Sequence, residues 1–187
     1  GVYESQKIDE IILIDLDSYN NKVKEPNFKL LKKISETSST PITFGGGIKT
    51  FKQVQEAFKS GADKIYLNSV LFQNLDIMKQ TIEMYGSQSI VAGLNLKLKN
   101  KNYYLLEDTN LKINPFEYAA KLEKLGAGEL KFTFVDLEGT KKGIDLVYAK
   151  KIKENINIPC IFEGGIGNLN HLKDFFNEKL DSISLGT

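Results

Sequence analysis

The chain contains no arginine and no tryptophan, and only one cysteine and one histidine among its 187 residues. A single cysteine, Cys160, cannot form an intrachain disulfide, which fits a reducing cytoplasm. No cluster of metal ligands surrounds Cys160 or His171, so we expect no metal and no cofactor. Without arginine, no guanidinium fork is available to bind phosphate.

Long apolar runs and an excess of one charge are missing as well. No apolar stretch approaches the roughly 18 residues of a membrane span, and no signal peptide precedes the first predicted strand. The net charge of +1 gives no reason to expect binding to nucleic acid or to a membrane. With 41% hydrophobic and 26% charged residues, the composition is typical of a globular protein. We expect a single cytoplasmic domain over residues 1–187.

The two halves of the chain resemble each other. Residues 41–48 (PITFGGGI) match residues 159–166 (PCIFEGGI), and DKIYLNS (63–69) matches DSISLGT (181–187) at the same offset of 118 residues. A repeat of this length suits a duplicated half-domain. Each copy has a glycine-rich turn after an apolar strand, where backbone N–H groups can bind phosphate. Two such turns predict a ligand with phosphate at both ends.

Short apolar runs alternate with amphipathic segments along the chain. The runs typical of strands are 10–16, 41–45, 64–68, 89–95, 129–135, 158–163 and 181–185. Helical periodicity predicts helices over 26–36, 51–60, 73–85, 114–125, 145–155 and 169–179. Segment 97–107 interrupts the alternation and predicts a β-hairpin with Lys-Asn at its turn. Strict alternation predicts a parallel β/α architecture.

The predicted fold class is α/β, a (β/α)8 TIM barrel built from two half-barrel repeats, about 1–95 and 96–187. An open doubly wound sheet is the alternative, which the half-repeat disfavours. A closed barrel needs eight strands, whereas the sequence predicts seven. The chain also begins with Gly1 and not with Met. We therefore expect an incomplete barrel that lacks its first strand and its last helix.

Polar side chains and glycines follow the predicted strands, where barrel proteins place their functional groups. These residues are Asp15, Asp17, Gly45–Gly47, Asn68, Ser69, Asn95, Asp136, Glu138, Gly164, Gly165, Gly186 and Thr187. Glycine is also common in ordinary βα turns. Two glycine turns at matching places, each followed one strand later by a small polar pair, favour phosphate binding.

At this point the chain resembles a known family over nearly its whole length. It is similar to HisF, the cyclase subunit of imidazole glycerol phosphate synthase in histidine biosynthesis, and less so to the isomerase HisA. The segments that carry the resemblance are IDEIILIDLD, PITFGGGIKTF, GADKIYLNS, YGSQSIVAGLN, EKLGAGEL and VDLEGTKKG. The resemblance implies a twofold-repeated barrel that binds a bisphosphorylated substrate.

The resemblance also implies roles for individual residues. One phosphate would be bound by Gly47, Asn68 and Ser69, and the other by Glu138, Gly139, Gly165, Gly186 and Thr187. Asp15 would lie in the mouth of the active site. HisF receives ammonia from a glutamine amidotransferase, HisH, on the opposite face of the barrel. Three members of the charged ring that gates this entry would be Glu10, Lys64 and Glu129, and Asp63 would face the partner. Charged residues often begin barrel strands, so these four also have a purely structural interpretation.

The chain departs from HisF where the acid–base chemistry is expected. HisF uses an aspartate at the end of its fifth strand, but this chain has Asn95 there, and an amide does not titrate. Counting alternate residues places Tyr66 inside the barrel, where it would narrow the ammonia path. The same counting places Lys131 inside, and Glu163 precedes the second glycine turn. Lys131 and Glu163 would pair with each other or with Glu129, or would form a replacement acid–base set.

Four interpretations therefore remain open. The first is a divergent HisF-like lyase or synthase subunit that uses ammonia from a glutaminase in another reaction, such as the amidation of a sugar. The second is an authentic cyclase that tolerates Asn95. The third is a catalytically silent barrel that activates a glutaminase, and the fourth is a HisA-type isomerase.

Overall fold

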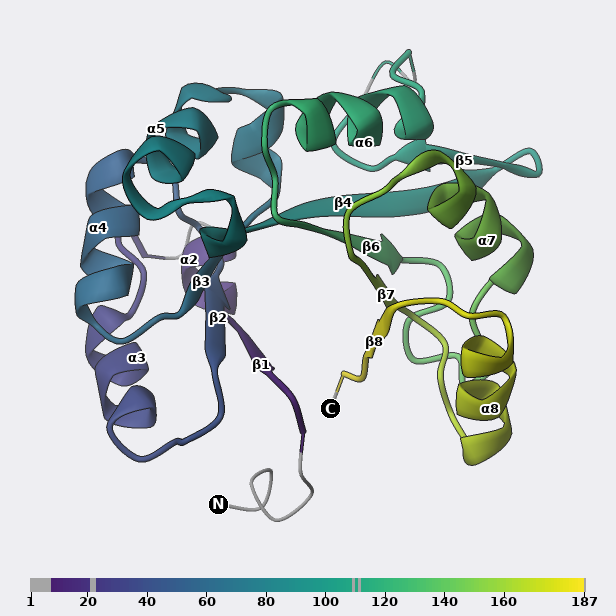
Figure 1. Cartoon of the computed structure of the whole chain (residues 1–187), viewed down its shortest axis with the longest axis horizontal. Coiled ribbons are helices and arrows are strands. Elements are labelled where there is room, and N and C mark those ends of the chain that lie inside the picture. Colours follow the sequence, from purple (N-terminus) through teal and green to yellow (C-terminus); the bar gives the residue numbers. More distant parts are fainter. Residues whose placement is uncertain (1–7, 21–22, 109, 111, 187) are drawn as a thin grey trace. The chain divides into compact units, whose positions relative to one another are not determined.

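The computed structural model describes residues 8–20, 23–108, 110 and 112–186 (Figure 1). The chain forms two compact units, Gly1–Val91 and Ala92–Thr187. The first unit contains the parallel strands β1 (Ile11–Ile14), β2 (Ile42–Gly45) and β3 (Lys64–Leu67) in that spatial order. Its helices are α2 (Leu16–Tyr19), α3 (Phe28–Ser35), α4 (Phe51–Lys59) and α5 (Asp76–Tyr85), with the 3-10 helices η1 (Ser69–Phe72) and η2 (Ser87–Ser89).

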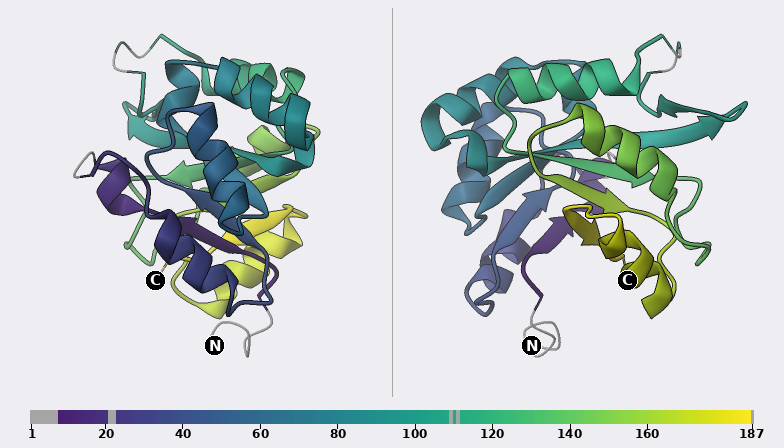
Figure 2. Two further views of the ribbon diagram at one scale, coloured as in Figure 1. Left: turned by 90° about the vertical axis from the view of Figure 1, so that its left-hand side faces the viewer. Right: turned by 45° about the vertical axis from the view of Figure 1, so that its right-hand side comes forward.

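Among the described residues of the first unit, α3, α4 and α5 lie on one face of the strands (Figures 1 and 2). The rings of Phe28 on α3 and Phe44 on β2 lie 6.1 Å apart, so Phe44 points to the helices. Because successive side chains on a strand alternate between faces, Thr43 and Gly45 point the other way. We call this other side the helix-free face. The register pairs Thr43 with Lys64 and Gly45 with Tyr66, so these four residues share that face.

The second unit repeats this plan. Its sheet contains β4 (Ile90–Lys99), which begins at the unit boundary, then β6 (Glu129–Phe134), β7 (Cys160–Glu163) and β8 (Ser182–Ser184), with β5 (Asn102–Leu105) antiparallel to β4. Its helices are α6 (Pro115–Lys124), α7 (Leu146–Asn155) and α8 (Leu169–Asn177). Phe134 contacts Tyr148 of α7, and Phe162 contacts Phe175 of α8. Lys131, Thr133 and Glu163 therefore lie on the helix-free face of this unit.

The β4–β5 hairpin projects beyond the other strands of the second unit (Figure 2). Its turn consists of Asn100 and Lys101, both with positive φ, as a two-residue hairpin turn requires. The turn is thus Asn-Lys, and not the Lys-Asn pair predicted above. Tyr103 attaches the hairpin to the start of α7, since its hydroxyl donates to Asp145 Oδ2 over 3.1 Å and its ring lies 4.4 Å from that of Tyr148.

Several helix ends are fixed by local signals in the sequence. Thr50 and Gln53 form a capping box at the start of α4, and the Asn168 side chain accepts from two backbone N–H groups at the start of α8. Gly61 and Gly126 follow α4 and α6 with φ of +96° and +99°, a conformation that favours glycine.

Several predicted boundaries differ from those of the structure, and two of the differences have a clear local cause. The first strand ends at Ile14 and not at residue 16, because Asp15 caps the short helix α2. The helix predicted from residue 73 begins at Asp76, since residues 69–72 already form the separate 3-10 helix η1.

The regular succession of parallel strands and covering helices in both units is that of a (β/α)8 barrel, and the predicted fold class is confirmed. Within the described part of the chain, no helix has the length and apolar character that crossing a membrane requires.

The first glycine turn should be sensitive to a single methyl group. Gly46 has φ of +96°, and a Cβ there would lie 2.4 Å from the Asp15 carbonyl oxygen. We expect Gly46→Ala to lower the free energy of unfolding by about 2 kcal/mol or more, measured by urea denaturation. Gly186→Ala is the control, since a Cβ there meets nothing within 4 Å. Equal stability of the two variants would contradict this account of the turn.

Candidate active site

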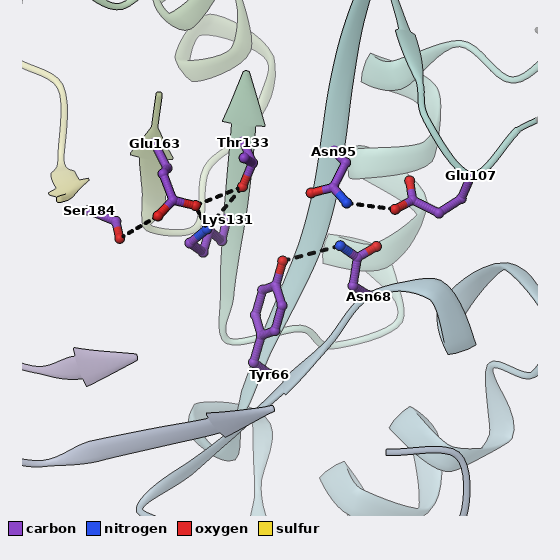
Figure 3. Close-up of polar contacts among 8 residues, drawn as sticks. All are labelled: Tyr66, Asn68, Asn95, Glu107, Lys131, Thr133, Glu163 and Ser184. Carbon is purple, nitrogen blue, oxygen red and sulfur yellow. Dashed lines mark hydrogen bonds and ion pairs between the residues drawn. The ribbon is translucent and has the colours of Figure 1, made fainter. Parts of the chain in front are cut away.

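Four polar side chains lie in one row on the helix-free face of the second unit (Figure 3). The register pairs Thr133 with Glu163 and Glu163 with Ser184. The hydrogen bond from the Val135 N–H to the Leu96 carbonyl, 3.0 Å long, places Asn95 level with Thr133. Aligned residues on neighbouring parallel strands point to the same side. The row therefore stands at the carboxyl ends of β6, β7 and β8, where barrel proteins place their chemistry.

A buried ion pair lies at the centre of this row. The Lys131 ammonium pairs with Glu163 Oε2 and donates to Thr133 Oγ1 over 2.9 Å. Thr133 Oγ1 donates to Glu163 Oε2 over 3.1 Å, and Ser184 Oγ donates to Glu163 Oε1 over 3.2 Å. Only 6% of the Lys131 side chain and 19% of the Glu163 side chain are exposed. The predicted pairing of Lys131 with Glu163 is thus present in the structure.

The charges of this cluster extend to Glu138, in the loop after β6. Desolvation raises the pKa of the Glu138 carboxyl, and the nearby negative charge of Glu163 raises it further, while Lys131 opposes both effects. A carboxylate repels phosphate, so Glu138 suits a phosphate site through its backbone N–H and not through its side chain.

Asn95 is hydrogen-bonded to a carboxyl group that the sequence analysis did not select. The Asn95 Nδ2 donates to Glu107 Oε1 over 2.8 Å (Figure 3). Among the described residues, Glu107 Oε2 is buried without a hydrogen-bond partner. Burial raises the pKa of Glu107, although the hydrogen bonds that it accepts lower it. Its charge also adds to the burial that raises the pKa of Tyr118 to about 12.

In the first unit, the proposed phosphate residues lie beside tightly packed backbone. Gly47 has φ of +69°, and a Cβ there would lie 2.0 Å from Ser18 Oγ, so this glycine is required by packing alone. The Asn68 Nδ2 donates to the Tyr66 hydroxyl over 3.2 Å, whereas Asn68 Oδ1 is buried with no partner among the described residues (Figure 3). Ser69 is exposed at the start of η1. An unpaired acceptor favours a donor in the ligand more than a phosphate.

In the second unit, two of the proposed phosphate residues have open space around them. A Cβ at Gly139 or Gly186 would meet nothing within 4 Å. Gly165 resembles Gly47, since a Cβ there would lie 2.3 Å from the Gly143 carbonyl oxygen. Thr187 lies outside the described residues. Backbone N–H groups at the open glycines can be approached closely by a phosphate.

Asp15, which the sequence places in the active-site mouth, accepts hydrogen bonds through both carboxyl oxygens. Oδ1 accepts from the Ser18 N–H over 3.0 Å, and Oδ2 accepts from the Asn27 N–H over 2.7 Å. These bonds start α2 and hold the segment before α3. Asp15 therefore has a structural role irrespective of any part in catalysis.

Of the residues proposed for the partner face, Lys64 and Glu129 begin β3 and β6, whereas Glu10 and Asp63 directly precede β1 and β3. In the first unit, Lys64 Nζ pairs with Glu10 Oε2 at 2.6 Å, and Thr43 Oγ1 donates to Glu10 Oε1. Asp63 Oδ2 accepts from the Ile42 N–H over 2.8 Å. In the second unit, Glu129 is half-buried at the start of β6.

The contact of Asp63 has an equivalent in the second unit. There Asp181 Oδ2 accepts from the Cys160 N–H over 2.9 Å, at the same offset of 118 residues from the first contact. In both halves, the aspartate that precedes one strand thus accepts a hydrogen bond from the first residue of the neighbouring strand.

A parallel β/α chain with a polar row at the carboxyl ends of its strands belongs to the class of (β/α)8-barrel proteins with a site at that end. The model of the histidine biosynthesis protein family matches residues 1–187. The chain belongs to this family, and its similarity to HisF proteins makes it a HisF-like member.

The similar proteins include HisF subunits of imidazole glycerol phosphate synthase. The one from Saccharolobus solfataricus is 33% identical over 180 residues, covering 95% of this chain and 71% of that protein. The one from Prosthecochloris aestuarii is 35% identical over 94% of this chain and 71% of that protein. A Campylobacter jejuni protein, provisionally named imidazole glycerol phosphate synthase subunit hisF2, is 34% identical over 98% of this chain and 73% of that protein.

Sequence reasoning missed Glu107, Thr133 and Ser184. Thr133 and Ser184 follow from the alternation that placed Lys131 on the helix-free face, once the strand register is known. Glu107 could have been suspected from the hairpin prediction, because a hairpin returns its second strand beside the first.

The buried pair allows a stability test with a matched double variant. Lys131→Met should leave the Glu163 carboxylate with its two hydroxyl donors and no cation, and should lower the free energy of unfolding by roughly 3–5 kcal/mol. Lys131→Met/Glu163→Leu removes both charges and should recover most of that loss. Urea denaturation of both variants measures the difference. A double variant no more stable than the single one would show that the ion pair is not the cause.

Proposed function

We propose that the protein is a HisF-like cyclase or synthase subunit that adds ammonia, delivered by a glutamine amidotransferase partner, to a phosphorylated substrate. Its membership in the family supports the reaction class. The observation that carries the proposal is the Lys131–Glu163 pair with Thr133 and Ser184, at the strand ends where this class places its chemistry.

The proposed reaction needs proton transfers, because ammonia loses a proton as it becomes bonded to carbon. Asn95 can orient a substrate but cannot take or give that proton. The Lys131 ammonium can donate a proton and the Glu163 carboxylate can accept one. The hydrogen bonds from Thr133 and Ser184 hold Glu163 in place for this role. In this proposal the pair replaces part of the acid–base machinery that an aspartate at position 95 would supply.

Phosphate would be held mainly by backbone N–H groups at the open glycines Gly139 and Gly186, which suits a chain without arginine. The partner would dock at the amino-terminal ends of the strands, near Glu10, Asp63, Lys64 and Glu129. Glu10 and Lys64 already pair, so ammonia entry beside them would require this ion pair to open.

Asn95 also favours a second, narrower proposal, that the acceptor differs from the HisF substrate. A phosphorylated sugar that is amidated is the acceptor we propose in that case. Similarity to the Campylobacter hisF2 protein is compatible with such a divergent member of the family.

The test combines turnover and binding. The purified protein is given free ammonium and the bisphosphorylated substrate of the HisF reaction; substrate loss is followed optically and binding by calorimetry. Turnover supports an authentic cyclase, and binding without turnover supports a different acceptor. Absence of binding, together with stimulation of a glutaminase, would overturn the proposal in favour of a silent, activating barrel.

A second experiment addresses the proposed acid–base pair. Lys131→Met should abolish turnover of an active protein while it leaves binding of the bisphosphorylated substrate intact. Glu163→Gln is the companion variant, since it nearly keeps the shape of the side chain but removes the carboxylate that would accept the proton and that pairs with Lys131. It should lower kcat by about 10²–10⁴-fold. Unchanged turnover in a folded Lys131→Met protein would exclude the pair from catalysis.

A further inference from the structure

We propose that Glu107 is a catalytic acid–base residue of this protein, and that the carboxyl group expected on β4 has moved to the end of the adjoining hairpin. Asn95 then serves as its positioning residue. This inference rests on the proposed function and names a further group for the same site.

The hairpin places Glu107 beside Asn95. The hairpin returns the chain from Lys99 to Asn102, and the Leu106 N–H donates to the Asn95 carbonyl over 2.8 Å. Glu107 is the next residue, and its Oε1 accepts from the Asn95 side chain. Two independent contacts thus fix this carboxyl group beside the residue that stands where HisF-like chains are expected to have an aspartate.

The two oxygens of Glu107 differ in a way that suits catalysis. Oε1 is held by Asn95, whereas Oε2 is buried and has no hydrogen-bond partner among the described residues. A buried polar atom without a partner costs about 1–3 kcal/mol. A bound substrate that supplies a donor to Oε2 would recover this energy. An oriented carboxyl group with one unused oxygen is what proton transfer to a substrate requires.

The surroundings of Glu107 set its protonation. The groups identified beside it are the Asn95 amide from β4 and the Tyr118 phenol from α6, whose pKa of about 12 keeps it neutral near pH 7. Burial raises the pKa of Glu107 above its ordinary value, and the hydrogen bonds that its carboxylate accepts oppose this rise. An acid–base catalyst works best when its pKa lies near the working pH.

The chemistry proposed for Glu107 is the addition of ammonia to a carbonyl carbon. As the N–C bond forms and the C=O π bond breaks, the Glu107 carboxylate accepts one proton from the attacking nitrogen. It then delivers that proton to the former carbonyl oxygen. The product carries an amino group and a hydroxyl group on the same carbon, and Glu107 returns to its carboxylate form, so no proton is gained or lost.

The test compares Glu107→Gln, Asn95→Asp/Glu107→Gln and the control Glu154→Gln, an exposed residue of α7. Turnover of the bisphosphorylated HisF substrate with ammonium gives kcat, and calorimetry gives its binding. Gln at 107 still accepts from Asn95, so a purely structural role would survive. For a catalytic role we expect kcat to fall by about 10²–10⁴-fold with binding nearly unchanged. The double variant, which restores a carboxyl group on β4, should recover part of the loss.

The pH profile separates proton transfer from packing. A base must be deprotonated to act, so in the unsubstituted protein kcat should fall as the pH drops through the raised pKa of Glu107. This dependence should disappear in the Glu107→Gln variant. An active protein whose Glu107→Gln variant keeps kcat within about threefold and the same pH profile would overturn the role of Glu107 alone. If the protein has no activity toward this substrate with ammonium and none in any other ammonia-dependent assay, the proposed function is overturned. The role of Glu107 is then overturned with it.

Discussion

The close approach of backbone to backbone at the glycine turns is the constraint on which the candidate site depends. A Cβ at Gly164 would lie 2.8 Å from the Phe134 carbonyl oxygen, so only glycine lets the chain after β7 pack against the end of β6. Glu163 directly precedes this turn and therefore reaches Lys131 and Thr133 on the neighbouring strand. In the first unit, Gly45 equally leaves room for the Tyr66 side chain.

The strands of the two halves have the same register, but their side chains at the corresponding positions differ in chemical character. In the first unit the row at the carboxyl ends of β1, β2 and β3 consists of Ile14, Gly45 and Tyr66. The corresponding row in the second unit consists of Thr133, Glu163 and Ser184. The row of the second unit thus contains a carboxylate that is hydrogen-bonded to two hydroxyl groups, whereas the row of the first unit contains no carboxylate.

The fold could be predicted from the sequence because its signals are local. Apolar runs, capping residues and glycines after helices lie within a few positions of the elements that they define. The observed strands therefore coincide with the apolar runs to within a few residues. The site could be predicted only in part. Lys131 and Glu163 were found by alternation along single strands. The hydrogen bond from the Asn27 N–H to Asp15 and the contact of Asn95 with Glu107 depend on where loops return, which no periodicity in the sequence records.

Electrostatics explain why an amide, and not a second carboxyl group, is hydrogen-bonded to Glu107. With an aspartate at position 95, two carboxyl groups would lie about one hydrogen bond apart, and like charges this close cannot both ionise without a large cost. An amide removes that repulsion and donates to Oε1, so the single carboxyl group keeps a definite orientation. Desolvation raises the pKa of Glu107, and the Asn95 hydrogen bond limits the rise. Asn95 taken alone looks like a lost catalytic carboxyl group. Its hydrogen-bond partner Glu107, twelve residues later on the returning arm of the hairpin, places a carboxyl group beside it.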